Sequence, residues 1–253
     1  MDDRFARWLA ALERRLLAEL TFPEVRRALQ ALSSAYVQQR RRFRDGAPLD
    51  ARGKRAAYAL FYAPLHFLVI SRILGELDDR AGGDRSTILD LGCGTGAAGA
   101  AWALHRGALA RIVGVDNRSW ALQEARRTWK ELSLRGRAEQ RDAATGRWPR
   151  PSARIVAAYL LNELDIDAQD RVLARLLRAS GAGAAVLVVE PIARRVAPRW
   201  DDWARSFVEA GGRADEWRFP VELPEPLFRL DRAAGLDHRV LTARSLWLPG
   251  SKS

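Results

Sequence analysis

Short apolar runs alternate with helix-length segments through most of the chain, and this alternation is the strongest constraint on its fold. The apolar runs lie at residues 87–91, 111–116, 137–142, 154–161 and 184–190, and a last one lies at 238–248. Helical patterns separate them at residues 97–106, 118–134, 167–180 and 194–210. Strands that alternate with helices of this length are typical of βαβ units. The sequence therefore predicts an α/β fold, a doubly wound and mostly parallel sheet.

The first 83 residues carry helical patterns only. Residues 5–20 place apolar side chains at intervals of three and four, which indicates one amphipathic helix. The segment Thr21–Glu24 has the form of a capping box, so a second helix is expected after it. A third is expected over 51–78, broken or kinked at Pro64. We predict a helical N-terminal extension over 1–83 and a second domain over 84–253. A further strand near residues 217–223 is doubtful, or an edge strand, because Pro220 lies within it.

Cysteine content and hydropathy limit the compartment and the chemistry. Cys93 is the sole cysteine among 253 residues, which excludes an internal disulfide and a cysteine-based metal cluster and suits a reducing compartment. No metal site is expected, because the three histidines are scattered. The longest apolar run, Ala63–Ile70, is far shorter than the roughly 20 residues of a membrane helix. A cytoplasmic protein without a membrane span is expected.

The chain is strongly basic, with 42 Lys and Arg against 31 Asp and Glu, a net charge of +11. Such a balance favours anionic partners such as RNA, although a solvated surface accounts for it equally well. The densest basic segment consists of Arg40, Arg41, Arg42, Arg44, Arg52, Lys54 and Arg55. It is either a phosphate-contacting patch or the solvated end of a helix. Trp200 and Trp203, between Arg199 and Arg205, are a second candidate surface for RNA or a methyl acceptor.

The most informative motif is Ile88–Gly96, in which a strand leads into three alternate glycines and then a helix. Glycines at such a turn let the main chain approach a ligand, at the sheet edge where open parallel sheets bind ligands. The formal match of residues 94–99 to a dinucleotide fingerprint is weak. The carboxylate of Asp90 would repel the negative charge of a pyrophosphate. It suits a ligand with cationic groups, such as S-adenosylmethionine. Asp116, at the end of the next strand, suits ribose hydroxyls in either case.

Asp90–Gly96 followed by Gly114–Asp116 resembles the first two motifs of class I S-adenosylmethionine-dependent methyltransferases. The resemblance implies a Rossmann-like, seven-stranded sheet with an antiparallel last strand and helices on both faces. It also implies that the glycine loop holds the methionine half of S-adenosyl-L-methionine, that Asp116 holds the ribose and that Asp142–Ala143 holds the adenine. The cofactor-binding residues implied in this way are Asp90, Gly92, Cys93, Gly94, Thr95, Gly96, Asp116, Asn117, Asp142, Ala143 and Tyr159.

A narrower resemblance rests on Tyr159–Leu164, Val188–Pro191 and Leu32–Tyr36. These segments are similar to the methyltransferase-like proteins that help assemble the mitochondrial small ribosomal subunit, and to their bacterial relatives. That family carries a C-terminal cysteine cluster for a metal centre, and this chain has none there. Without these cysteines the chain is not expected to carry that metal centre, and the ribosomal role is left open.

The methyl acceptor is not defined by the sequence. Asn162 and Glu163 follow the fourth strand, beside the expected methyl position, and are the catalytic candidates. The alternative is helix capping, in which Asn162 or Asp165 starts the following helix. Glu190 either lines the acceptor pocket or belongs to a strand-end loop, and His66 either caps the acceptor site or is a core residue. Two functions are predicted. One is methyl transfer to a small molecule or RNA, and the other is an RNA- or ribosome-binding assembly factor on a methyltransferase fold with little or no catalysis. A dinucleotide oxidoreductase is a remote third.

Overall fold

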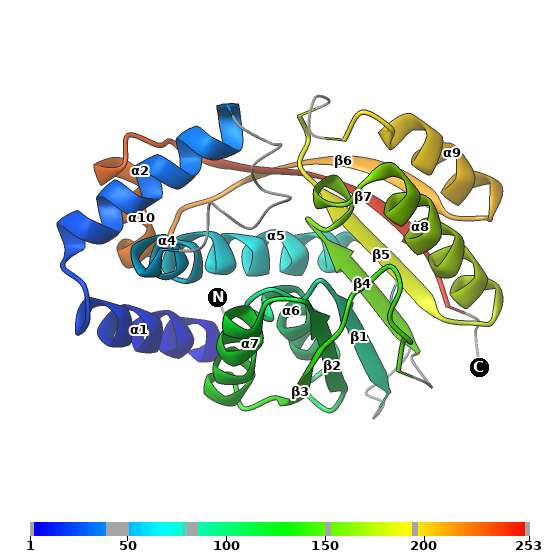
Figure 1. Ribbon diagram of the computed structural model, residues 1–253, viewed down its shortest axis with the longest axis horizontal. Coiled ribbons are helices and arrows are strands. Elements are labelled where there is room, and N and C mark those ends of the chain that lie inside the picture. The colour runs from blue at the N-terminus through cyan, green and yellow to red at the C-terminus, as the bar shows by residue number, and fades with distance from the viewer. Residues whose placement is uncertain are drawn as a thin grey trace. The chain divides into compact units, whose positions relative to one another are not determined.

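The computed structural model describes residues 3–38, 51–77, 79, 86–149, 153–193 and 197–250 (Figure 1). The chain divides into two compact units, which are described separately. One comprises Met1–His66 with Pro220–Leu241, and the other comprises Phe67–Phe219 with Thr242–Ser253. The domain boundary predicted at residues 83–84 lies outside the described residues, so the division into an extension and a cofactor domain remains a proposal.

A seven-stranded sheet forms the second unit (Figure 1). Its strands are β1 (Thr87–Leu91), β2 (Arg111–Asp116), β3 (Arg135–Gln140), β4 (Arg154–Ala158), β5 (Ala185–Glu190), β6 (Arg213–Pro220) and β7 (Val240–Leu248). Their order is β3-β2-β1-β4-β5-β7-β6. Strands β1 to β5 pair in parallel and β7 pairs antiparallel to β5. The predicted doubly wound, mostly parallel sheet is confirmed.

Strand alternation divides the buried side chains between two helical layers. The helices described in this unit are the larger part of α5 (Ala63–Glu76), α6 (Ala97–His105), α7 (Ser119–Glu131), α8 (Ile166–Gly181), α9 (Trp200–Glu209) and the 3-10 turn η3 (Leu161–Glu163). Leu89 and Ile155 belong to the core that also contains residues of α8 and α9. Asp90, which follows Leu89 in β1, and Ile112 of β2 instead lie against α6 at Gly99. Because successive strand residues point to opposite faces, the sheet is covered on both sides.

The first unit consists mainly of helices, with bounds α1 (Asp3–Leu17), α2 (Phe22–Gln38), α4 (Arg52–Ala57), the π turn η2 (Tyr58–Tyr62), the start of α5 (Ala63–Glu76) and α10 (Glu225–Ala233). The predicted apolar face of α1 is buried, with Phe5 and Trp8 almost inaccessible. The capping box also forms, because Glu24 accepts hydrogen bonds from the backbone N–H and the hydroxyl of Thr21. Sequence periodicity and capping therefore predicted these two helices correctly.

The helix through Pro64 continues where the sequence predicts a break or a kink. In the π turn just before it, the N–H of Ala63 bonds to the carbonyl of Tyr58, and the chain returns to an α-helix that ends at Glu76. The resulting helix, Arg52–Glu76, is long and apolar enough to cross a membrane, but 67% of its most apolar window is buried inside the fold. A core helix has the same property, so the hydropathy of this helix is accounted for by packing.

Four local features differ from the sequence-based predictions. Strand β3 begins at Arg135 and not at residue 137; its first three residues are exposed and give almost no hydropathy signal. Strand β6 lies at the edge of the sheet, as one alternative predicted, but it spans Arg213–Pro220 and not 217–223. Helix α10 was not predicted, although Pro226 in its first turn is a start signal. Trp200 and Trp203 are only 6% and 2% exposed, so they are core residues and not a surface for RNA or an acceptor.

Candidate cofactor-binding site

The glycine loop between β1 and α6 has a backbone that only glycine adopts easily. Gly92, Gly94 and Gly96 have φ of 61°, 50° and 81°, in the left-handed region. The loop is also closely packed. A Cβ added at Gly92 would lie 2.6 Å from the side chain of Leu160, and one at Gly96 would lie 2.7 Å from the indole of Trp129. Both the turn and its packing therefore require the glycines that the sequence places there.

Trp129 of α7 packs against this loop and bonds to it, a role that was not predicted from the sequence. Its indole N–H donates to the carbonyl of Gly96 at 2.9 Å. An added Cβ at Gly114 on β2 or Gly136 on β3 would lie 2.7 Å or 2.3 Å from its ring. Glycines on three separate elements thus make room for one tryptophan. Glycine in the middle of two strands was the signal for such a close approach.

We expect Trp129→Phe to lower the free energy of unfolding by about 1–2 kcal/mol, because it removes a buried hydrogen bond together with part of the ring. Trp203→Phe is the matched control. Within the described residues the indole N–H of Trp203 is buried without a hydrogen-bond partner, so its removal should cost less. Urea unfolding of both variants measures the difference. An equal loss in the two variants would contradict a supporting role for the Trp129 hydrogen bond.

Asp90 lies on the inner side of the loop. Its side chain is 1% exposed, and its Oδ2 accepts from the backbone N–H of Gly99 in α6 at 2.8 Å. Burial, with a smaller contribution from the nearby Asp116 carboxylate, raises the pKa of Asp90 to about 7. This geometry differs from the expectation of a carboxylate facing the cationic groups of a ligand, because Asp90 fastens the first turn of α6 to β1.

Asp116 links the ends of β1 and β2. Its Oδ2 accepts from the N–H of Gly94 at 2.9 Å, and its Oδ1 accepts from the N–H of Arg118 at 2.8 Å. An ionised carboxylate offers about four acceptor positions, so two remain for further donors. Asn117, next in the chain, is exposed, and its carbonyl accepts from the side chain of Gln140. The structure thus brings the β2 acid directly to the glycine loop, as the sequence predicts.

Two loop residues are held inside the fold. The N–H of Cys93 bonds to the carbonyl of Val115 at 3.0 Å, and its side chain is 6% exposed. Burial, followed by the charges of Asp90 and Asp116, raises the pKa of this thiol well above its usual value. A protonated, buried thiol packs as a small apolar group. Thr95 is 3% exposed, so its side chain also lies within the fold.

Asp142 and Ala143 form a turn just beyond the end of β3. Oδ1 of Asp142 accepts from the N–H groups of Ala144 and Thr145 and from the Thr145 hydroxyl. Burial of Asp142 opposes these hydrogen bonds but does not outweigh them, and its pKa is lowered. The carbonyl of Ala143 accepts from the Trp148 indole N–H at 2.8 Å. Asp142 therefore stabilises the turn through Oδ1, and its Oδ2 takes no part in these three hydrogen bonds.

A polar cluster follows β4. Oε1 of Glu190 accepts from the N–H of Leu161 at 2.8 Å and from that of Asn162 at 3.4 Å, and the Asn162 side-chain amide donates to Oε2. Glu190 is fully buried, and burial raises its pKa to about 8 although these hydrogen bonds lower it. It is therefore a positioning residue that fixes the orientation of Asn162. Neither of the two alternatives for Glu190 described this role.

Glu163 and Tyr159 complete this cluster. Oε2 of Glu163 lies 3.4 Å from the guanidinium of Arg118, the residue whose N–H binds Asp116. Burial raises the pKa of Glu163, against the attraction of Arg118. Tyr159 has φ of 57°, a strained value for a residue with a side chain. The strain lies between β4 and η3, at the sheet edge that carries the glycine loop. Helix capping is performed by Asp165, which accepts from the N–H of Ala168, and not by Asn162.

Residues 88–183 match the family described as methyltransferase domain. A search of curated proteins found no significant match. Similar solved structures include a candidate O-methyltransferase from Nostoc punctiforme, with 14% identity over 92% of this chain and 71% of that chain and a TM-score of 0.52. The magnesium protoporphyrin IX methyltransferase of Synechocystis, solved with S-adenosylmethionine, is 14% identical over 74% of this chain and 80% of that chain, with a TM-score of 0.50. The plantazolicin methyltransferase BpumL is 11% identical over 90% of this chain and 98% of that chain, also with a TM-score of 0.50.

At these identities the structural likenesses establish the fold alone, and the family match covers residues 88–183, less than half of the chain. The second unit therefore has the Rossmann-like fold of the class I methyltransferases. The residues present fit S-adenosyl-L-methionine, the cofactor that the sequence predicts. The positive-φ loop leads into the N-terminus of α6, and Asp116 at the end of β2 keeps two acceptor positions beside it. The narrower likeness to ribosome assembly proteins stays a prediction.

Proposed function

We propose that the protein is an S-adenosylmethionine-dependent methyltransferase whose cofactor lies along the glycine loop and Asp116. The observation that supports it most is the hydrogen bond from the Gly94 N–H to Asp116, which joins the loop after β1 to the acid after β2. In this arrangement the loop backbone holds the methionine half and the free acceptor positions of Asp116 receive the ribose hydroxyls. Asp142 and Ala143, beyond β3, are the proposed adenine contacts.

The bound cofactor supplies a methyl group already activated by its sulfonium, so the protein contributes mainly by positioning the acceptor. A near-attack arrangement can contribute about 7–11 kcal/mol by itself. Asn162 is the proposed orienting group, because Glu190 holds its amide and backbone N–H. Its remaining amide oxygen is an acceptor for an O–H or N–H of the acceptor molecule.

Glu163 is the proposed proton acceptor where methyl transfer also requires loss of a proton. A carboxylate with a pKa raised by burial is a better base near neutral pH than an exposed one. Arg118 stands beside it and stabilises the charge that remains on the carboxylate between turnovers. Small molecules and RNA remain the proposed acceptors, and the cytoplasmic location remains a prediction.

Asp116→Asn tests the cofactor site. In this variant an amide nitrogen replaces one carboxylate oxygen of Asp116, and both oxygens accept a backbone N–H in the parent. Either the N–H of Gly94 or that of Arg118 therefore loses its acceptor, and the ribose contact weakens. We expect titration calorimetry to show about tenfold weaker binding of S-adenosylhomocysteine, close to 1.4 kcal/mol. The exposed α8 residue Asp167, changed to Asn, is the control and should bind as the parent does. Normal binding by Asp116→Asn, or parent binding of NADH and not of S-adenosylhomocysteine, would overturn the proposal.

The assembly-factor alternative gains no support from the basic segment. Four of its seven residues, Arg40, Arg41, Arg42 and Arg44, lie outside the described residues. Of the others, Arg52 forms an ion pair with Glu19, and Lys54 and Arg55 are half-buried. RNA contact through this segment therefore stays a prediction from the sequence.

A further inference from the structure

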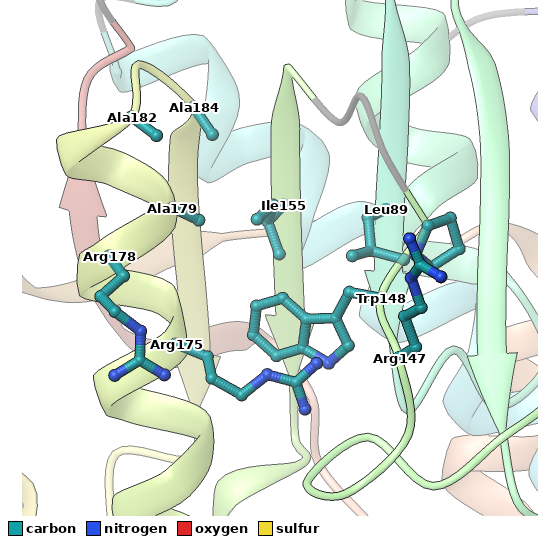
Figure 2. A pocket seen from close by; sticks show the side chains of 10 residues that line it. Leu89, Arg147, Trp148, Ile155, Arg175, Arg178, Ala179, Ala182 and Ala184 are labelled. Carbon is teal, nitrogen blue, oxygen red and sulfur yellow. The ribbon is translucent and has the colours of Figure 1, made fainter.

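A cavity of about 640 Å³ opens on the face of the sheet that carries α8 (Figure 2). Its floor is aliphatic, formed by Leu89 of β1, Ile155 of β4 and Ala184 just before β5. The last turns of α8 form one wall and Trp148 the other. Ile155 and Ala184 lie at the N-terminal ends of their strands, whereas the glycine loop follows the C-terminal end of β1. In a parallel sheet these are opposite edges, so the cavity is separate from the cofactor site.

The cavity lies beside a crossover whose described residues contain no helix. The connections β1–β2, β2–β3 and β4–β5 each contain a helix, namely α6, α7 and α8. Parallel strands are usually joined in this way. Between β3 and β4, by contrast, the described residues 141–149 and 153 contain no helix. The side chain of Trp148 covers only part of the sheet face over β1 and β4, and an apolar surface remains open beside it (Figure 2).

Among the described residues, three arginines and no carboxylate line the cavity. Arg175 is fixed, because its guanidinium donates to the carbonyls of Ala144 and Gly146 and lies 4.0 Å over the ring of Trp148. Arg147 and Arg178 are exposed, and neither forms an ion pair within the described part of the chain. The wall is therefore pre-organised, and two cationic groups at its rim have no counterion among the described side chains.

We propose that this cavity binds a small amphiphilic anion, a compact apolar or aromatic body carrying one carboxylate, sulfonate or phosphate. The volume is in the range of small-molecule sites, and the aliphatic floor suits an apolar body. The anionic group lies at the rim, where Arg178 on one side of the cavity or Arg147 on the other supplies charge-assisted hydrogen bonds (Figure 2). A stacked nucleic acid strand fits less well, because Arg175 already covers one face of Trp148.

Two fluorescent probes of nearly the same shape test the proposal. Anilinonaphthalene sulfonate carries the required charge, and phenylnaphthylamine has the same rings without it. We expect the parent to bind the sulfonate about tenfold more tightly than the neutral amine. Saturation with S-adenosylhomocysteine should leave both affinities unchanged. Displacement of the sulfonate by S-adenosylhomocysteine would overturn the proposal, because the probe would then occupy the cofactor site.

Two sets of variants locate the probe. Ala179→Trp fills the cavity from α8 and should weaken both probes at least tenfold, whereas Ala174→Trp, at an exposed position of the same helix, should weaken neither. The double variant Arg147→Ala, Arg178→Ala should weaken the sulfonate about tenfold and leave the amine unchanged. It alters only exposed side chains, so it tests the site even if Ala179→Trp unfolds. Its control is the exposed Arg171→Ala, which should bind both probes normally.

Two further results would contradict the proposal. One is sulfonate binding that is the same in the parent, in folded Ala179→Trp and in the double arginine variant. The other is displacement of the sulfonate by a short single-stranded oligonucleotide at lower concentration than by a naphthalene carboxylate, which would identify a nucleic-acid surface. None of these outcomes depends on methyltransferase activity, so failure of this proposal leaves the cofactor proposal standing.

Discussion

Gly96→Ala is expected to lower the free energy of unfolding by about 3 kcal/mol and to weaken S-adenosylhomocysteine binding at least tenfold. Two causes combine. The residue has φ of 81°, where a side chain costs about 1–2 kcal/mol. In addition, the new Cβ would lie 2.7 Å from Trp129 and 3.0 Å from the backbone of Ala125, so either α7 or the loop must move. Movement of the loop also displaces the Gly94 N–H from Asp116.

Gly107→Ala separates these two causes. Gly107 has φ of 75°, close to that of Gly96, but nothing lies within 4 Å of an added Cβ. We expect a loss of only about 1 kcal/mol and unchanged cofactor binding, because only the backbone strain is introduced. Urea unfolding and titration calorimetry of both variants measure the contrast. Equal losses of stability would show that Trp129 does not hold the loop.

The sequence was sufficient for those features that depend on local patterns. Strand and helix alternation predicted the α/β sheet, and the glycines of residues 92–96 with Asp116 predicted the meeting of the first two strand ends. Helix α1 followed from a clear amphipathic repeat. In each case the signal lies within one segment, or follows from the rule that parallel strands end at the same edge of a sheet.

The features that the sequence did not predict depend on side chains from distant segments. Glu190 bonds to Asn162, 28 residues earlier, and Trp129 fills space left by Gly96, Gly114 and Gly136. No single-segment pattern encodes such contacts. Asp90 was expected to face the cationic groups of a ligand, but strand alternation directs it toward α6. The cavity beside α8 was not predicted either, because its lining comes from β1, β4, α8 and the loop before β4.

Glu190→Gln is expected to change the pH dependence of stability. Burial raises the pKa of Glu190 in the folded protein to about 8, from 4.5 in an exposed chain. Between these values the folded state keeps a proton that the unfolded state has released. The contribution of Glu190 to stability is therefore complete below pH 4.5 and is lost as the pH rises to 8. Glutamine does not titrate, so the variant should gain on the order of 4 kcal/mol relative to the parent from about pH 5 to about pH 8.

Urea unfolding of parent and variant at several pH values measures this difference. Asp90, whose pKa is also raised, is present in both proteins, so its contribution cancels. Glu209→Gln, on the exposed side of α9, should show no such trend. A constant difference between parent and Glu190→Gln would mean that the carboxyl titrates near its usual value. Glu190 would then be ionised at neutral pH, with both oxygens accepting from Leu161 and Asn162 throughout. The raised pKa predicts instead that Glu190 stays protonated through neutral pH and ionises only near pH 8.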